Sequence, residues 1–193
     1  MLVYDRLRRY GPRSQEITRM TWSETFLNVL KNNDIRLVTY VPDNVLTPLI
    51  KGATEDCYFK SIVATREDEA LGIAAGAWMA GMHSVVLMQT SGFAVAPNAL
   101  ASLIVPSHIP AILVVSERGT LGEFNIGQVL VSRVMRPTLD ALAVTHHTLT
   151  DETTMPFIVD RSIKQAIATQ APVVFILSPL LTGGKTFSQQ ARS

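Results

Sequence analysis

The chain carries, at Thr65–Gly81, the stretch TREDEALGIAAGAWMAG, in which three acidic residues lead into a helix of mostly small residues. Thr65 can cap this helix with Asp68 three residues on, and Glu67, Asp68 and Glu69 would fall in the first turn, where the helix dipole favours negative charge. Small side chains recur at Gly72, Ala74, Ala75, Gly76, Ala77, Ala80 and Gly81. Each glycine inside a helix costs about 1 kcal/mol relative to alanine, which close approach by another backbone or a ligand would offset. We therefore expect a closely packed helix whose leading carboxylates either cap it or serve a site.

Short apolar runs and helical patterns alternate on both sides of this stretch. The apolar runs predict six strands, at 37–40, 59–63, 85–88, 112–115, 145–149 and 173–177. Helices are predicted from about Thr21, where Thr21 and Glu24 can form a capping box, and at 45–53, 67–80, 97–104, 137–143 and 152–168. This alternation is typical of an α/β fold, a doubly wound six-stranded parallel sheet with helices on both faces.

Polar motifs follow four of the predicted strands. They are VPDN at Val41–Asn44, the residues before Glu67, QTSG at Gln89–Gly92 and SERG at Ser116–Gly119. In parallel sheets of this kind, ligands bind beyond the carboxyl ends of the strands. The four motifs are therefore expected to meet at one edge of the sheet and to form a site there.

The composition fits one compact domain. The chain has 193 residues, of which 47% are hydrophobic and 17% charged, enough to bury one sizeable core. We expect an N-terminal arm at residues 1–20, a domain at 21–181 and a polar C-terminal tail at 182–193. The tail contains GGKT at Gly183–Thr186, but the earlier glycine of a phosphate-binding loop is replaced by Pro179, so a P-loop is not predicted.

Charge and cysteine content exclude several classes of protein. A formal net charge of +1 gives no reason to expect nucleic acid as a partner. The single Cys57 cannot form an internal disulfide, which favours a cytoplasmic location. No apolar run reaches the roughly 18 residues of a membrane span, so no membrane association is expected.

The order of the motifs resembles that of a known enzyme family. Arg66, Glu67, Ala70, Ala74 and Gly76 match the segment of thiamine-diphosphate enzymes that carries the glutamate facing the aminopyrimidine of the cofactor. VPDN, MQTSGF at 88–93, NALASL at 98–103, ERG at 117–119 and QVLVSR at 128–133 then follow as in the alpha subunits of sulfopyruvate and phosphonopyruvate decarboxylases. The resemblance covers roughly residues 22 to 180.

The resemblance implies half of an active site. This chain would be the pyrimidine-binding domain, with Glu67 as the catalytic, cofactor-binding carboxylate. A separate domain of such enzymes binds the diphosphate through Mg²⁺ and carries a GDG signature, which is absent from this sequence. We therefore expect thiamine diphosphate and Mg²⁺ as cofactors, with the metal ligands on a GDG-bearing beta subunit of a hetero-oligomer and no metal site in this chain.

The resemblance also assigns the residues around the cofactor. Asp43 and Asn44 would lie near the substrate and assist proton transfer, although a simple turn pair would explain them equally well. The turn Gln89, Thr90, Ser91 and Gly92 would contact the cofactor, with Thr90 also reaching the substrate. Where the family continues with a glycine and an asparagine, this chain has Ala94 and Val95, which places the identity of the substrate in question.

Arg118 and Gln128 are the remaining candidates for substrate binding. A guanidinium presents a rigid fork of donors to a sulfonate, phosphonate or carboxylate, and a surface arginine is the alternative reading of Arg118. His146 and His147 fall on a predicted strand, where adjacent side chains point to opposite faces, so we assign them to structure.

The sequence thus predicts a subunit of a 2-oxo acid decarboxylase, a carbon-carbon lyase, with a sulfopyruvate-like substrate. Phosphonopyruvate or a neutral or aromatic 2-oxo acid remains an alternative substrate. A catalytically silent binding or regulatory subunit of the same fold is an alternative of another class. A nucleotide-binding domain is disfavoured because no GxGxxG follows the first strand.

Overall fold

The computed structural model describes residues 20–185 and contains one parallel sheet of six strands. The strand order is β2-β1-β3-β4-β6-β5, and every neighbouring pair is parallel. The strands are β1 (Ile35–Tyr40), β2 (Lys60–Val63), β3 (His83–Gln89), β4 (Ile112–Ser116), β5 (Thr145–Leu149) and β6 (Val173–Leu177). All six predicted strands, and the predicted fold class, are confirmed.

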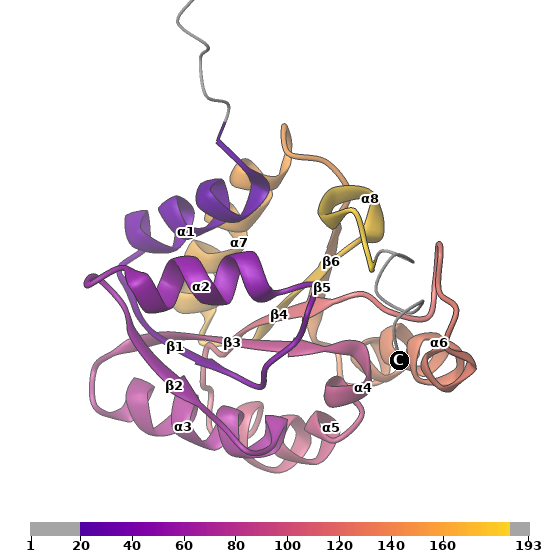
Figure 1. The fold of residues 1–193 in the computed structure, drawn as a ribbon. Coiled ribbons are helices and arrows are strands. Elements are labelled where there is room, and N and C mark those ends of the chain that lie inside the picture. Colours follow the sequence, from indigo (N-terminus) through magenta and orange to yellow (C-terminus); the bar gives the residue numbers. More distant parts are fainter. Residues whose placement is uncertain (1–19, 186–193) are drawn as a thin grey trace, which may run out of the picture.

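Helices cover both faces of the sheet (Figure 1). On one face lie α1 (Trp22–Asn32), α2 (Thr47–Glu55) and α7 (Met155–Thr169). On the other lie α3 (Glu67–Met79), the short α4 (Thr90–Phe93) and α5 (Ala96–Ala99), the π-helical turn η2 (Leu100–Ile104) and α6 (Ile126–Ala141). A last short helix, α8 (Pro179–Thr182), follows β6. None of the helices within residues 20–185 is long and apolar enough to cross a bilayer.

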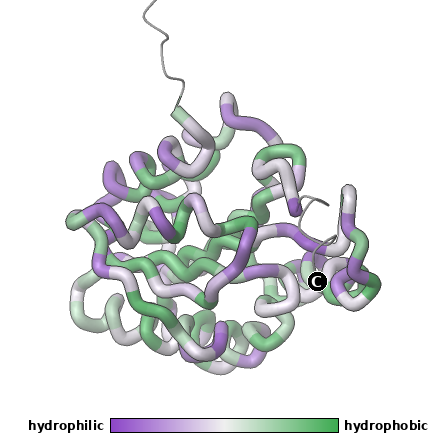
Figure 2. The backbone as a smooth tube through the Cα atoms, viewed as in Figure 1, coloured by the Kyte–Doolittle hydropathy of each residue, from purple (hydrophilic) through white to green (hydrophobic). Residues whose placement is uncertain are grey.

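The core is therefore two layers, one on each side of the sheet. Phe26 and Phe175 meet edge to face in one layer, and Phe93 is enclosed in the other. The central strands β4 and β6 are buried along their whole length, as parallel strands covered on both faces must be. Figure 2 shows hydrophobic residues along the strands in the middle of the fold, whereas the outer helices carry both hydrophobic and hydrophilic residues.

One helix start agrees with the prediction and another differs from it. The capping box of Thr21 and Glu24 at α1 is confirmed, with both hydrogen bonds present. The helix expected at 137–143 instead begins at Ile126, where the Asn125 side chain accepts a hydrogen bond from the N–H of Gly127. Pro137, where the prediction began this helix, lies inside it. The cap at Asn125, twelve residues upstream, sets the start.

The small-residue helix α3 also corrects its prediction. Thr65 is not the N-cap; Arg66 holds that place, and Thr65 instead donates from its N–H and hydroxyl to the Glu69 carboxylate at 2.7 and 2.5 Å. Alanine side chains of α3 face the sheet, whereas Gly72 and Gly76 face outward with nothing within 4 Å of an added Cβ. The close approach that was expected at these two glycines does not occur within residues 20–185.

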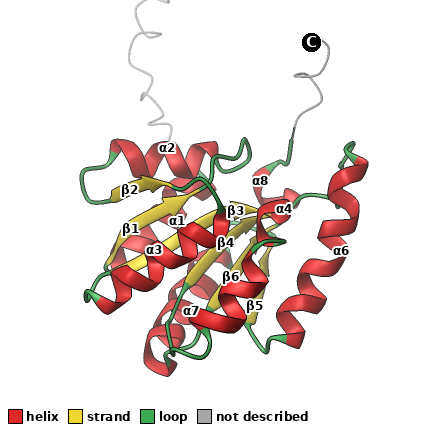
Figure 3. Cartoon of the chain, turned by 90° about the horizontal axis from the view of Figure 1, so that it is seen from below, coloured by secondary structure: helices red, strands yellow, loops and turns green. Residues whose placement is uncertain are grey.

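The carboxyl ends of β1, β2, β3 and β4 meet at one edge of the sheet, as predicted. Figure 3 shows the strands side by side between the helical layers, so loops that are far apart in the sequence open at the same edge. Residues 1–19 of the arm predicted at 1–20 and residues 186–193 of the tail predicted at 182–193 lie outside the described residues.

Candidate functional site

A chain of hydrogen bonds ties three strand-end loops together at this edge. The Ser116 hydroxyl, at the end of β4, donates to Asp43 Oδ1 at 2.9 Å. The Thr90 hydroxyl donates to the Ser116 carbonyl at 3.1 Å and accepts from the Arg118 N–H at 3.0 Å. Ser116 and Thr90 are fully buried, so these bonds are formed away from water. The relative positions of the loops after β1, β3 and β4 are therefore fixed by polar groups of the chain itself.

This network decides what Asp43 and Thr90 can do. Asp43 Oδ1 also accepts the N–H groups of Val45 and Leu46, so one carboxylate oxygen holds the turn into α2. The predicted turn role of Asp43 is thus present, and Asp43 also lines the pocket described below. The Thr90 hydroxyl, predicted to reach cofactor and substrate, is instead enclosed and committed to internal partners.

Arg118 forms a buried pair with Glu123. Its Nε and Nη2 donate to the two carboxylate oxygens at 2.8 and 3.0 Å, and both side chains are almost completely buried. Burial opposes ionisation of Glu123, but the hydrogen bonds from Arg118 and from the N–H groups of Asn125 and Gly119 outweigh it and lower its pKa to about 2. The positive charge predicted to meet the substrate is therefore already balanced within the chain. Substrate binding by Arg118 stays a prediction.

Gly119 allows the Arg118 loop to pack against the start of α6. Its φ is +78°, and an added Cβ would lie 2.2 Å from the Gln128 carbonyl oxygen and 2.7 Å from Ser132 Cβ. Gln128, a predicted substrate ligand, is thereby held against this loop in the first turn of α6. Its side-chain oxygen is enclosed and has no hydrogen-bond partner within the described residues.

The three acidic residues at the start of α3 are not equivalent. The Asp68 carboxylate accepts hydrogen bonds from Nε and Nη2 of Arg66, and these bonds lower the pKa of Asp68. Glu69 accepts from Thr65, and these hydrogen bonds lower the pKa of Glu69. Within residues 20–185, no hydrogen bond is formed by the Glu67 carboxylate, which is half-buried. Glu67 is thus the member of the cluster whose oxygens are available to a ligand.

Gly92 determines where the Glu67 carboxylate lies. A Cβ added at Gly92 would be 2.0 Å from Glu67 Oε1, 2.4 Å from its Cδ and 2.8 Å from its Cγ, so the carboxylate lies directly against the Gly92 backbone. The first turn of α3 and the turn after β3 are therefore in contact through these two residues. The sequence identifies both residues as candidates for cofactor binding but does not predict that they are in contact.

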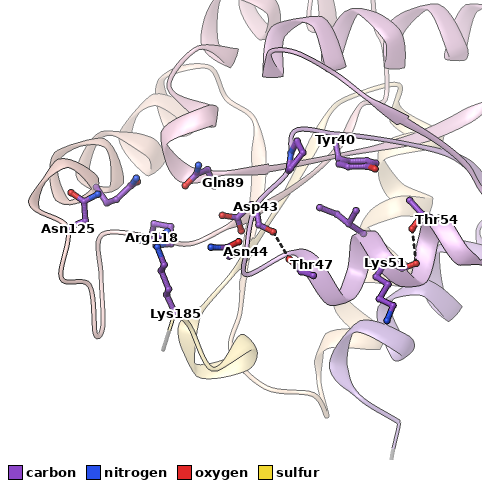
Figure 4. Close-up of a pocket in the computed structure, with 13 residues that line it drawn as sticks. Tyr40, Asp43, Asn44, Thr47, Lys51, Thr54, Gln89, Arg118, Asn125 and Lys185 are labelled. Atoms are coloured by element: carbon purple, nitrogen blue, oxygen red, sulfur yellow. Dashed lines mark hydrogen bonds between the residues drawn. The ribbon is translucent and has the colours of Figure 1, made fainter. Parts of the chain in front are cut away.

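An open pocket of about 660 Å³ lies beside this edge. Figure 4 shows Asp43, Asn44 and Gln89 in its middle, Tyr40, Thr54 and Lys51 at one end, and Arg118, Asn125 and Lys185 at the other. The pocket thus brings together Asp43, Asn44, Gln89, Arg118 and Gln128 of the predicted site. Asn125, Lys185 and the pairing of Glu123 with Arg118 were not identified from the sequence. Of these, only Asn125 has a recognisable sequence signal, because asparagine is a common helix N-cap.

Several other groups take structural roles. His146 and His147 lie on the edge strand β5, where His147 stacks on Phe175 and burial, with the neighbouring His146 charge, lowers the pKa of His147. Across residues 20–185, no group of three or more His, Cys, Asp or Glu side chains is arranged to hold a metal ion.

Curated relatives identify the family. The alpha subunit of sulfopyruvate decarboxylase from Methanocaldococcus jannaschii is 39% identical over 125 residues, which cover 65% of this chain and 74% of the relative. That from Methanothermobacter thermautotrophicus is 37% identical over 126 residues, covering 65% and 76%. The chain belongs to the sulfopyruvate decarboxylase alpha-subunit family. Membership in this family confirms the resemblance seen in the motifs. No family model matches the chain.

A solved structure supports the fold of this alpha-subunit family. A thiamine diphosphate-dependent 4-hydroxybenzoylformate decarboxylase from Rhodococcus jostii RHA1 superposes with a TM-score of 0.65 at 20% identity, over 82% of this chain and 30% of that one. The shared part is the parallel sheet with its two helical layers.

The buried Arg118–Glu123 pair leads to a prediction about stability. Glu123→Gln should lower the free energy of unfolding at pH 7 by about 3 kcal/mol, because the pKa of Glu123 falls from 4.5 to about 2 on folding. This contribution is complete above pH 4.5 and is lost as the pH falls toward 2. Urea unfolding at pH 7 and pH 3 should therefore show a difference between wild type and variant that shrinks in acid.

Glu55→Gln is the matched control. Glu55 is an exposed carboxylate 3.8 Å from Lys51, so its loss should change stability by less than about 0.5 kcal/mol. A Glu123→Gln loss of equal size at both pH values would mean that the shape of the side chain, rather than its charge, holds the loop.

Proposed function

We propose that this chain is the pyrimidine-binding subunit of a thiamine-diphosphate-dependent sulfopyruvate decarboxylase, with Glu67 as the carboxyl group that meets the aminopyrimidine ring. The observation that carries the proposal is the placement of Glu67. Its carboxylate lies against Gly92 at the carboxyl edge of the sheet and forms no hydrogen bond within residues 20–185, while Asp68 and Glu69 are both engaged. Family membership supports the choice of reaction.

The residues present fit one half of the cofactor. A ring nitrogen needs a carboxyl group that is positioned but not already hydrogen-bonded, and Gly92 provides the space in which Glu67 meets that need. Glu67 is the residue that would hold a proton at its carboxyl oxygen against the ring. When bound, thiamine diphosphate supplies the electron sink that accepts the electrons of the bond to the departing CO₂.

The other edge residues orient and enclose the substrate. Asp43 is held by Ser116 and by two backbone N–H groups through one oxygen, which leaves its second oxygen for the pocket. Asn44 and Gln89 line the same pocket and offer amide groups to a 2-oxo acid. The buried polar network keeps these groups in place without rearrangement when substrate binds.

The diphosphate and Mg²⁺ belong to a second subunit in this proposal. The sequence contains no GDG motif, and the curated relatives are themselves named as one subunit. A partner carrying GDG would complete each site, and the assembled enzyme would be a hetero-oligomer.

Reconstitution tests the proposed function. The chain alone should not decarboxylate sulfopyruvate, whereas mixing it with a GDG-bearing subunit, thiamine diphosphate and Mg²⁺ should release CO₂ in proportion to the limiting subunit. Turnover by the isolated chain would contradict the division of the site between two subunits. A fully assembled complex that releases no CO₂ would instead favour a silent regulatory role.

Glu67 and Asp68 provide a matched pair of variants. Glu67→Gln keeps the size of the side chain but removes its acid-base function, so turnover of the assembled enzyme should fall by roughly 10²- to 10⁴-fold. Asp68→Asn should leave turnover nearly unchanged because Asp68 is engaged by Arg66 on the exposed side. Both variants can be compared with the wild type by steady-state CO₂ release and by exchange of the thiazolium C2 proton of the bound cofactor. Equal losses would contradict the assignment of roles within the cluster.

Gly92→Ala should disable Glu67 without unfolding the chain. The added methyl group would meet the Glu67 carboxylate at 2.0 Å, and the three nearest atoms all belong to that flexible side chain, which can swing away. Turnover should therefore fall toward that of Glu67→Gln, with a change in stability of about 1 kcal/mol or less. The double variant Glu67→Gln/Gly92→Ala should be little worse than Glu67→Gln alone. If the double variant instead lost turnover by the product of the two single losses, Gly92 would act independently of Glu67.

A further inference from the structure

The charges that line the pocket at the sheet edge are unevenly compensated. Three cationic residues, Lys51, Arg118 and Lys185, line it. The charge of Arg118 is balanced by Glu123, to which Arg118 donates two hydrogen bonds. The Lys51 ammonium lies 3.8 Å from the Glu55 carboxylate. Lys185 forms no salt bridge with any carboxylate of residues 20–185. It therefore brings uncompensated positive charge to the pocket.

The backbone directs Lys185 to this position. Helix α8 ends at two consecutive glycines, Gly183 with φ +78° and Gly184 with φ +62°, a left-handed turn that other residues rarely adopt. The chain thereby turns back toward the edge of the sheet, and Lys185 Nζ lies 5.5 Å from the centre of the Phe124 ring. Lys185 as a residue is half-buried, and an ammonium over an aromatic face is attracted to it as a cation.

Neutral polar groups accompany Lys185 at the same end of the pocket. Figure 4 shows Lys185 directed toward the region between Asn44, Arg118 and Asn125, with Lys51 at the opposite end. Gln128 also lines the pocket, and its enclosed side-chain oxygen has no partner among the described residues. Since an amide can present either oxygen or nitrogen, Gln128 can turn its donors toward an anion.

We propose that Lys185 is the counter-charge for the second anionic group of the substrate, an inference that rests on the proposed function. Sulfopyruvate and phosphonopyruvate share a tetrahedral oxyanion at the end remote from the bond that breaks. With the oxo acid group beside Asp43 and Gln89 in the middle of the pocket, that oxyanion lies toward Lys185. A desolvated anion requires a paired cation, and Arg118 is already paired with Glu123.

Kinetics of the assembled enzyme test this assignment. Lys185→Met should lower kcat/KM for sulfopyruvate by roughly 10- to 100-fold, mostly through KM, while pyruvate, which has a neutral tail, should change little. Lys185→Arg should recover most of the loss because it restores the charge. Lys164→Met, on α7 and outside the pocket, is the matched control and should leave both substrates unaffected. Phosphonopyruvate, assayed in parallel, shows which oxyanion the site prefers.

Three results would overturn the proposal. They are an unchanged kcat/KM for sulfopyruvate in Lys185→Met, an equal loss on pyruvate, and the same selective loss in Lys164→Met. Any of them, in an enzyme that still decarboxylates sulfopyruvate, contradicts the role of Lys185 and leaves the proposed function intact.

A binding measurement separates this proposal from the proposed function. Sulfoacetate carries the two anionic groups but cannot be decarboxylated by the same route, and calorimetric titration of the assembled complex gives its Kd. Lys185→Met should raise that Kd by roughly 10-fold or more and leave acetate binding unchanged. Selective loss of sulfoacetate binding in a complex without decarboxylase activity would support Lys185 and contradict the reaction. An unchanged Kd would contradict Lys185 whether or not the enzyme turns over.

Discussion

The buried hydrogen bonds of Ser116 are the interaction on which the site depends. The Ser116 hydroxyl donates a hydrogen bond to Asp43 after β1, and its carbonyl accepts one from Thr90 after β3. The Thr90 hydroxyl in turn accepts a hydrogen bond from the Arg118 N–H after β4. A parallel sheet brings its loops to a common edge but does not fix their relative positions. Here buried polar groups do so, because each of them would lose its hydrogen-bond partner if the loops moved apart.

The edge is divided into two regions with different chemistry. On one side, Glu67 lies against Gly92 with its oxygens free of other partners in the described chain. On the other, the pocket between α2 and the start of α6 carries amides, one held carboxylate and the Lys185 ammonium. In the proposed function, the first region would meet the aminopyrimidine ring of the cofactor, and the second would hold the substrate. The loop network lies between them and sets their separation.

The strands and the shared edge could be predicted from the sequence because both follow from local pattern. An apolar run bounded by polar turns predicts a strand, and parallel order then places VPDN, QTSG and SERG together. The contacts within the site could not be predicted in the same way. Gly92 meets Glu67 across 25 positions of sequence, and the Arg118–Glu123 pair depends on the shape of one loop. The predicted start of α6 was too late for a different reason, since the prediction did not include the cap at Asn125.

The place of β6 in the sheet has a consequence for biosynthesis. Among the six strands within residues 20–185 it comes last in the sequence, yet it lies between β4 and β5, and the Glu117 N–H donates to the Leu177 carbonyl. During translation, one edge of β4 therefore remains without its partner strand until residues 173–177 have left the ribosome. The hydrogen bond between Glu117 and Leu177 can form only then, so the site is completed after β6 has been synthesised. A nascent chain stalled before Val173 would expose the apolar edge of β4, the kind of surface that chaperones bind and that otherwise leads to aggregation.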